Sequence, residues 1–204
     1  MRSAAAAALC LSIAACSSGV SSGAESREDT TGRRDSIAAV AVASMNESNV
    51  IGLLSQVHEA DSALGALAAA KGSTLNVKEF GRMVLREHRA LRKDIIDLGE
   101  QMGAPPVPPS TPADAPPAAG LNALNDASAS LAWDAAYLDY TIAEHQSSLE
   151  NTARALAATR RVEVRQFVSR SVPILQKHLD KARQLRKALS RARPAPVAQR
   201  PSGR

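Results

Sequence analysis

The sequence predicts an all-α protein, a bundle of four helices. Aromatic residues make up 2% of its 204 residues, and the β-branched and aromatic runs that favour strands are scarce. In four segments of about 25 residues, apolar residues recur at alternating steps of three and four, which is the period of an amphipathic helix. A stretch with seven prolines separates the second segment from the third. A chain of this length is expected to form one domain.

The first two predicted helices are joined by a short turn. The first begins near residues 46–49 and ends at Lys71-Gly72-Ser73, because glycine suits a helix end and Ser73 or Thr74 can cap the next helix. The second covers residues 75–102. The core-facing positions of the first are Val50, Leu54, Val57, Asp61, Leu64 and Ala68. Those of the second are Val77, Phe80, Val84, His88, Leu91, Ile95, Leu98 and Met102.

A crossover loop and two more helices follow. Residues 103–120 hold the seven prolines and predict a semi-rigid loop, and residues 121–126 predict a short helical turn. Pro173 lies inside the fourth helix and is expected to kink it or to release one backbone hydrogen bond. The core-facing positions of the third helix, 130–158, are Leu131, Ala135, Leu138, Ile142, His145, Leu149, Thr152 and Leu156. Those of the fourth, 162–191, are Val164, Val168, Ser171, Leu175, His178, Ala182, Leu185 and Leu189.

Two short turns and one long Pro-rich connection between the second and third helices are typical of a ferritin-like four-helix bundle. The direction of the second helix pair stays open. Each predicted helix also places one polar side chain on its apolar face, namely Asp61, His88, His145 and His178. A buried polar group without a partner costs about 1–3 kcal/mol, so these four side chains are expected to share one layer.

Two interpretations of this layer remain open. Three neutral imidazoles and a carboxylate suit a transition metal, with zinc, copper or iron as candidates. Alternatively, the histidines form a hydrogen-bonded polar core with Asp61, Thr152, Ser171 or buried water. His58, one turn before Asp61 and near its face, is either an additional ligand or a surface residue, and the surface is favoured. Asp134 is expected to lie about 16 Å from His145 and to favour the start of its own helix.

The N-terminus predicts export and lipid attachment. A positive charge at Arg2 precedes an apolar run from Ala4 to Ile13 that is too short to span a bilayer. The end of this run and the three residues after it, Ile13-Ala14-Ala15-Cys16, resemble a bacterial lipobox, so cleavage before Cys16 and acylation of Cys16 are expected. The alternative is an ordinary secretory signal with a chance cysteine. Ser17 in place of aspartate favours the outer membrane in a Gram-negative cell.

The expected organisation therefore has four parts. They are a lipoprotein signal peptide (1–15), the lipid-attachment cysteine with a flexible tether (16–45), the four-helix bundle (46–191) and a disordered, basic, Pro-rich tail (192–204). The expected location is the periplasmic side of the cell envelope. Cys10 and Cys16 are the only cysteines, so the mature domain has no thiol for catalysis, disulfides or metal ligation.

The charge pattern bears on partners. From Lys181 to Arg204 there are eight Lys/Arg and no Asp/Glu, which accounts for the net charge of +5. This tail predicts contact with an envelope protein or an anionic surface, unless it only solubilises the terminus. The membrane is a partner through the N-terminal lipid. Nucleic acid is not expected, because the chain is exported and has five aromatic residues for base stacking.

Three separated motifs resemble a known bacterial family. They are residues 80–88 (FGRMVLREH), residues 133–138 (WDAAYL) with His145 downstream, and residues 172–179 (VPILQKHL). The chain resembles domain of unknown function 4142, a family of predicted outer-membrane proteins, from about Val50 to Leu189. The resemblance implies a ferritin-like fold and no agreed activity. The family usually has glutamate where this chain has Asp61, and phenylalanine where it has Trp133.

Two functions are compatible with these features. The first is a lipid-anchored envelope protein acting as a non-catalytic helical binding or envelope-maintenance module. The alternative is a metal-binding or metal-dependent redox protein that uses Asp61, His88, His145 and His178. Di-iron chemistry is disfavoured because leucine or isoleucine, not glutamate, stands three residues before each core-facing histidine. A hydrolase is not supported, since the histidines lack an obvious serine or cysteine partner.

Overall fold

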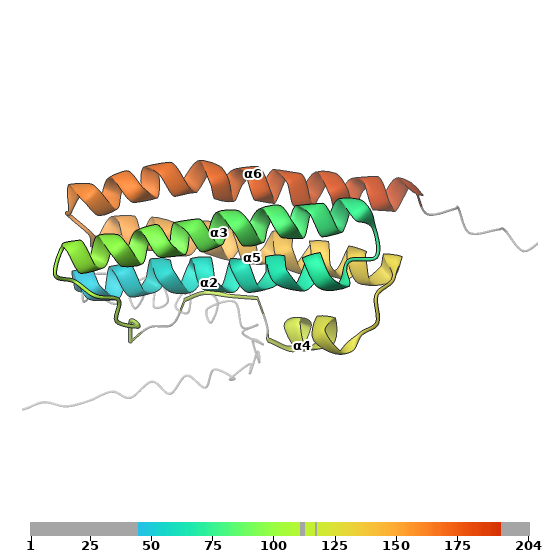
Figure 1. Ribbon diagram of the computed structural model, residues 1–204, viewed down its shortest axis with the longest axis horizontal. Helices are drawn as coiled ribbons and strands as arrows, with labels where there is room; N and C mark the ends of the chain where they lie inside the picture. Colours follow the sequence, from blue (N-terminus) through green and yellow to red (C-terminus); the bar gives the residue numbers. More distant parts are fainter. Residues whose placement is uncertain (1–44, 111–112, 117, 193–204) are drawn as a thin grey trace, which may run out of the picture. The chain divides into compact units, whose positions relative to one another are not determined.

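The computed structural model describes residues 45–110, 113–116 and 118–192, and within these ranges it contains helices and no strand. The helices are α2 (Glu47–Lys71), α3 (Leu75–Gln101), α4 (Ala118–Asp126), α5 (Leu131–Ala158) and α6 (Val162–Ala192) (Figure 1). The all-α prediction is confirmed for this part of the chain. The predicted signal peptide, Cys16, the tether up to residue 44 and the basic tail from residue 193 lie outside the described residues.

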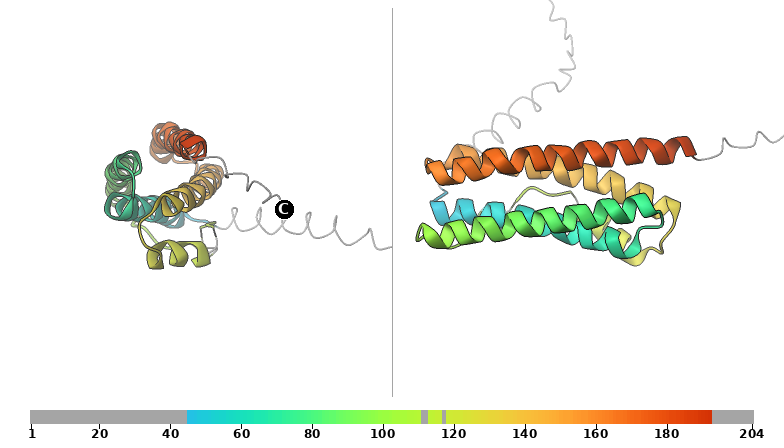
Figure 2. Two further views of the ribbon diagram at one scale, coloured as in Figure 1. Left: turned by 90° about the vertical axis from the view of Figure 1, so that its right-hand side faces the viewer. Right: turned by 45° about the horizontal axis from the view of Figure 1, so that its top comes forward.

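The four long helices form a bundle in which each packs against two neighbours. α2 packs against α3 and α5, and α6 packs against α5 and α3, so the helices surround a common core (Figure 2, left). α2 and α6 run in one direction and α3 and α5 in the other, because the chain crosses the length of the bundle between α3 and α5 (Figure 1). α4 lies outside the bundle, against α5.

Side-chain caps fix where the helices begin. Asn46 Oδ1 accepts from the backbone N–H of Asn49 at 2.9 Å, and Ser130 Oγ accepts from the N–H of Trp133 at 3.0 Å. Between the two candidate caps of α3, Thr74 is the N-cap, and its hydroxyl accepts from Val77 N–H. These side chains satisfy backbone donors that have no partner within the helix.

Asp134 lies in the first turn of α5, as predicted, and it also contacts the start of another helix. Its two carboxylate oxygens accept from the backbone N–H groups of Ser73 and Thr74 at 2.7 and 2.8 Å. Asp134 therefore joins the start of α5 to the turn between α2 and α3, where the free N–H groups and the helix dipole attract a negative charge. This contact links residues about sixty positions apart, so spacing along one helix did not indicate it.

Glycines bring α2 and α3 close together. A Cβ built on Gly65 would lie 2.4 Å from the backbone nitrogen of Leu85, and one built on Gly81 would lie 2.6 Å from that of Ala69. Both distances are far below ordinary van der Waals contact, so only glycine fits at these two positions. Two turns away from these glycines, the close approach lets His58 on α2 reach His88 on α3.

Two details of the fold differ from the predictions. Leu131 is 57% exposed, and the buried face of α5 is turned toward Tyr137, Thr141 and Ser148. Ser148 on this face reaches the polar layer described below, where its hydroxyl donates to Asp61. α4 begins at Ala118, so the last residues of the predicted loop are helical. Pro173 lies inside α6, as predicted, and the helix runs from Val162 to Ala192 on both sides of it. Since proline has no N–H, one backbone hydrogen bond is missing there.

The core has an apolar cluster at each end and a polar layer between them. One cluster includes Leu64, Val84 and Leu138, and the other includes Leu54, Leu91 and Val168. The buried histidines and Asp61 lie between these positions on their helices. Among the described helices, none combines the length and the apolar character that crossing a membrane requires.

Candidate metal centre

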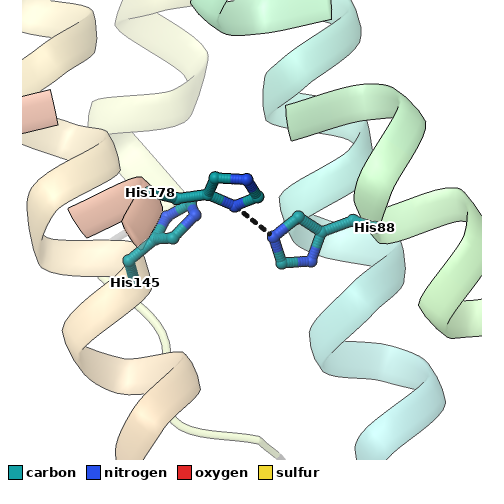
Figure 3. A group of neighbouring side chains, drawn as sticks. All are labelled: His88, His145 and His178. Carbon is teal, nitrogen blue, oxygen red and sulfur yellow. Dashed lines mark hydrogen bonds between the residues drawn. The ribbon is translucent and has the colours of Figure 1, made fainter. Parts of the chain in front are cut away.

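The four side chains predicted to share a layer do meet in the middle of the bundle. Asp61 comes from α2, His88 from α3, His145 from α5 and His178 from α6, and each is 0% exposed. Figure 3 shows the imidazoles of His88, His145 and His178 pointing toward one another from three helices. The expectation of a common layer is therefore met in this structure. Whether these residues bind a metal stays a prediction.

His58 belongs to the same layer, and the prediction that it lies at the surface is wrong. Its side chain is 0% exposed, with ring centroids 5.3 Å from His88 and 5.7 Å from Phe167. His58 stands three residues before Asp61, so both side chains occupy one helix face, which is the signal that could have placed it in the core. The close packing of α3 and α6 then covers it.

The imidazoles approach one another within hydrogen-bonding distance. His88 Nε2 lies 3.0 Å from His178 Nδ1, the contact drawn in Figure 3, and His88 Nδ1 lies 3.2 Å from His58 Nδ1. Candidate ligand atoms of His88, His145 and His178 all lie within 4.8 Å of one another. The same holds for His58, Asp61 and His88. His88 is therefore common to two groups that have the spacing of metal ligands.

Glu87 fixes the orientation of the His178 ring. His178 Nε2 lies 2.9 Å from Glu87 Oε2, and Lys177 Nζ donates to the same oxygen at 2.6 Å. Because the paired carboxylate only accepts, His178 carries its proton on Nε2. The lone pair of His178 is then on Nδ1 and faces His88. Glu87, which the sequence did not single out, adjoins His88 in the chain but contacts a residue on another helix.

His145 is oriented in the same way by a backbone group. Its Nδ1 lies 3.1 Å from the carbonyl oxygen of Thr141, which can only accept, so Nδ1 carries the proton. His145 Nε2 then has a lone pair, and this buried atom has no hydrogen-bond partner within the described residues. Metal-ligating histidines in proteins commonly donate their other ring N–H to a carboxylate or a backbone carbonyl. His178 and His145 show these two arrangements.

Asp61 is the acidic group of the layer. Ser148 Oγ donates to Asp61 Oδ2 at 2.9 Å, while His88 Nδ1 and His145 Nδ1 each lie 3.4 Å from one carboxylate oxygen. Burial raises the pKa of Asp61 to about 7, against the opposing effect of the Ser148 hydrogen bond. Asp61 Oδ1 is buried without a hydrogen-bond partner in the part of the chain that the structure describes.

The imidazoles are neutral near pH 7. Burial lowers the pKa of His58 to about 3 and those of His145 and His178 to about 4, and it lowers the pKa of His88 well below 6.5. A metal ion binds the neutral form of histidine. These rings are already neutral, so no proton must leave an imidazolium before a metal ion binds. The layer therefore offers lone pairs that are already available at neutral pH.

The hydroxyl groups proposed as alternative partners are used elsewhere. Thr152 Oγ1 donates to the carbonyl of Ser148 at 2.7 Å, and Ser171 Oγ donates to the carbonyl of Val168 at 3.1 Å. Neither proton is directed at an imidazole. Among the described residues, His58 Nε2, His145 Nε2 and Asp61 Oδ1 therefore have no hydrogen-bond partner, so a purely hydrogen-bonded core would need buried water at these atoms.

The layer makes the stability of the metal-free protein depend on pH. As the pH falls below 6.5, the unfolded chain protonates four histidines that stay neutral in the folded protein. In the opposite direction, burial raises the pKa values of Asp61 and Glu144 to about 7, so the folded protein holds two protons that the unfolded chain has lost above about pH 4.5. Between pH 6.5 and pH 4.5, unfolding therefore adds up to four protons at the histidines and releases two at Asp61 and Glu144, a net uptake of about two protons.

We therefore expect metal-free protein to lose stability as the pH falls from 6.5 toward 4.5. The loss is about 1.4 kcal/mol per pH unit for each net proton. Circular dichroism melts at pH 7, 6 and 5, with chelator present, measure this as a steadily decreasing Tm. A Tm that stays constant or rises between pH 7 and pH 5 would contradict neutral, buried imidazoles.

Comparisons with known proteins place the chain among helical proteins. A family model described as "Domain of unknown function (DUF4142)" matches residues 33–185. No curated protein matches the chain. Among solved structures, the Cu(I)-bound form of CopM has 17% sequence identity and a TM-score of 0.57, covering 71% of this chain and 97% of CopM.

Two further structures are similar at the same level. The silver-soaked form of CopM covers 71% of this chain and 96% of its own, with 17% identity and a TM-score of 0.57. A DUF305 fragment from Deinococcus radiodurans covers 72% and 97%, with 18% identity and a TM-score of 0.59. At these identities the likeness concerns the fold, a helical bundle.

Proposed function

This chain belongs to the DUF4142 family, and we propose that its bundle binds a transition metal ion through His88, His145 and His178, with Asp61 beside them. The observation that carries the proposal is the convergence of three fully buried imidazoles from three helices, two of which are held by outer hydrogen bonds that leave a lone pair free. The course of the helices is also consistent with a ferritin-like arrangement of the bundle.

Copper is the first metal to test. Neutral imidazole suits copper and zinc, and the layer contains no thiolate and one carboxylate. CopM, which has a similar fold, was solved with Cu(I), Cu(II) and silver bound. Its low identity gives no residue correspondence, so it supports the choice of metal to test and nothing about the ligands. The proposal extends to a redox role, because copper bound to protein ligands can change oxidation state.

Elemental analysis tests the proposal. We expect the full chain, purified without chelator or histidine tag, to carry at least one equivalent of a transition metal. A variant with His88→Ala, His145→Ala and His178→Ala is expected to carry none. Saturating metal at about 100 times Kd should add about 2.7 kcal/mol to the stability of the wild type alone. Wild-type protein that retains no copper or zinc after loading and dialysis would contradict the proposal.

We further propose that this metal-binding bundle is anchored on the periplasmic side of the cell envelope by a lipid on Cys16. The support is the four-residue lipobox after a short apolar run. The earlier interpretation, a non-catalytic envelope module, remains compatible with this location, and a metal-carrying module need not be an enzyme. Contacts of the basic tail with an envelope protein or an anionic surface belong to the same proposal.

Replacing Cys16 with serine is expected to abolish anchoring. The variant should leave the membrane fraction or remain unprocessed, and it should lack the mass added by acyl chains, because serine offers no thiol for acylation. Cys10→Ser is the matched control and should stay anchored, since Cys10 is removed with the signal peptide. Cell fractionation and intact-mass measurement decide the matter. A Cys16→Ser protein that still carries lipid would show that the lipobox was misread.

A further inference from the structure

A second group of ligand atoms lies on the other edge of the His88 ring. His88 Nε2 faces His178 in the proposed centre, whereas His88 Nδ1 faces His58 Nδ1 at 3.2 Å and Asp61 Oδ2 at 3.4 Å. The two ring nitrogens of an imidazole point in different directions. The group His58, Asp61 and His88 is therefore a separate cluster that shares one residue with the first.

The second group also has unsatisfied acceptor atoms. His58 and Asp61 are both 0% exposed, and within the described ranges His58 Nε2 and Asp61 Oδ1 have no hydrogen-bond partner. Such atoms are costly in a protein interior unless something binds to them. On the far side, the His58 ring packs against Phe167, an apolar wall that offers it no donor.

The separations match those of atoms that share one metal ion. For metal–nitrogen bonds of about 2.0–2.1 Å, two ligands of a tetrahedral ion lie about 3.3 Å apart. The 3.2 Å and 3.4 Å separations around His88 Nδ1 are close to this value, and so is the 3.0 Å separation between His88 Nε2 and His178 Nδ1. Little movement of the side chains is needed for an ion to replace the hydrogen bonds.

We propose that His58, Asp61 and His88 form a second cation subsite, so that the bundle holds two monovalent soft metal ions bridged by the His88 imidazolate. This inference rests on the proposed function, because the first ion occupies the His88, His145 and His178 group. The bridge requires both nitrogens of His88 as ligands. His88 therefore releases its remaining ring proton to solvent as the second metal–nitrogen bond forms, and no electron is transferred.

Charge balance selects the class of ion. Two monovalent ions such as Cu(I) or Ag(I) are neutralised by ionised Asp61 and the His88 imidazolate, so no net charge is buried. Two divalent ions would leave two positive charges uncompensated in a layer that is closed to solvent, which is strongly unfavourable. The pair of subsites therefore discriminates by charge in favour of monovalent ions when both are filled.

Native mass spectrometry with Ag(I) tests the second subsite. The protein is the full chain with Cys10→Ser and Cys16→Ser, which removes its thiols while keeping its four methionines. The His88→Phe variant lacks both subsites, and the number of silver ions that it binds is subtracted from the number bound by each other variant. We expect two ions in the chain with all histidines intact, one in His58→Phe and one in His145→Phe. Phenylalanine fills the space of each imidazole without offering a ligand.

The outcomes separate the two proposals. No silver above the His88→Phe level would overturn the proposed function itself. One ion that persists in His58→Phe would overturn the second subsite and leave the proposed function standing. Two ions in His58→Phe would overturn the assignment of His58.

Proton release gives a test that needs no variant. In unbuffered solution at pH 8.5, the second equivalent of Ag(I) should release one proton per chain, the ring proton of His88. Binding of two ions without this release would overturn the imidazolate bridge.

Discussion

Replacing Gly65 with valine is expected to destabilise the bundle by about 3 kcal/mol or more, a large part of the stability of a typical domain. The first atom of the new side chain, Cβ, would lie 2.4 Å from the Leu85 nitrogen and 2.8 Å from the Gly81 oxygen. Both are backbone atoms, so no rotation of a side chain can relieve the overlap. α2 and α3 must move apart, which separates His58 and Asp61 from His88.

Ala63→Val is the matched control for this substitution. Ala63 is exposed and lies two residues before Gly65 on the same helix. Valine there loses only helix propensity, which costs about 0.5 kcal/mol. Chemical denaturation of both variants measures the difference. If Gly65→Val unfolds at the same denaturant concentration as Ala63→Val, the claim that α2 and α3 are too close at Gly65 to admit a side chain is wrong.

Replacing Glu87 with glutamine is expected to weaken metal binding by about 10- to 100-fold, the usual cost of losing an outer hydrogen bond to a metal ligand. The Glu87 carboxylate only accepts, and it therefore holds the His178 proton on Nε2 and the lone pair on Nδ1, facing His88. An amide can accept or donate. With glutamine at this position the His178 proton can occupy either nitrogen, and part of the protein then offers no lone pair to the metal.

Two measurements separate this effect from a loss of structure. Competition with a chelator gives the metal affinity, and 15N NMR of metal-free protein reports which nitrogen of His178 carries the proton. Glu59→Gln is the matched control, because Glu59 pairs with Arg92 at the surface. We expect an unchanged Tm for both variants and a shifted His178 signal only for Glu87→Gln. Equal affinity in Glu87→Gln and wild type would rule out this positioning role.

Local signals in the sequence predicted the helices and most of the candidate site. Apolar spacing placed the four long helices, and the candidate caps Ser73 and Thr74 placed the start of α3, because both signals depend on neighbours within a few positions. The same spacing put Asp61, His88, His145 and His178 on core-facing positions, and all four are buried together. The export signal and Cys16 also follow from short motifs, and they stay predictions because they lie outside the described residues.

The tertiary structure decided what depends on contacts between distant segments. Four findings depend on how different helices pack. They are the burial of His58, the orientation of α5 that buries Thr141, the contact of Asp134 with the α2–α3 turn and the hydrogen bond between Glu87 and His178. A helical pattern gives the direction of a side chain around its own axis, but not the partner it meets. For this protein, the sequence determined that Asp61, His88, His145 and His178 enter the core. The packing of the helices determined that His58 joins them and which imidazole nitrogens are left without a hydrogen-bond partner.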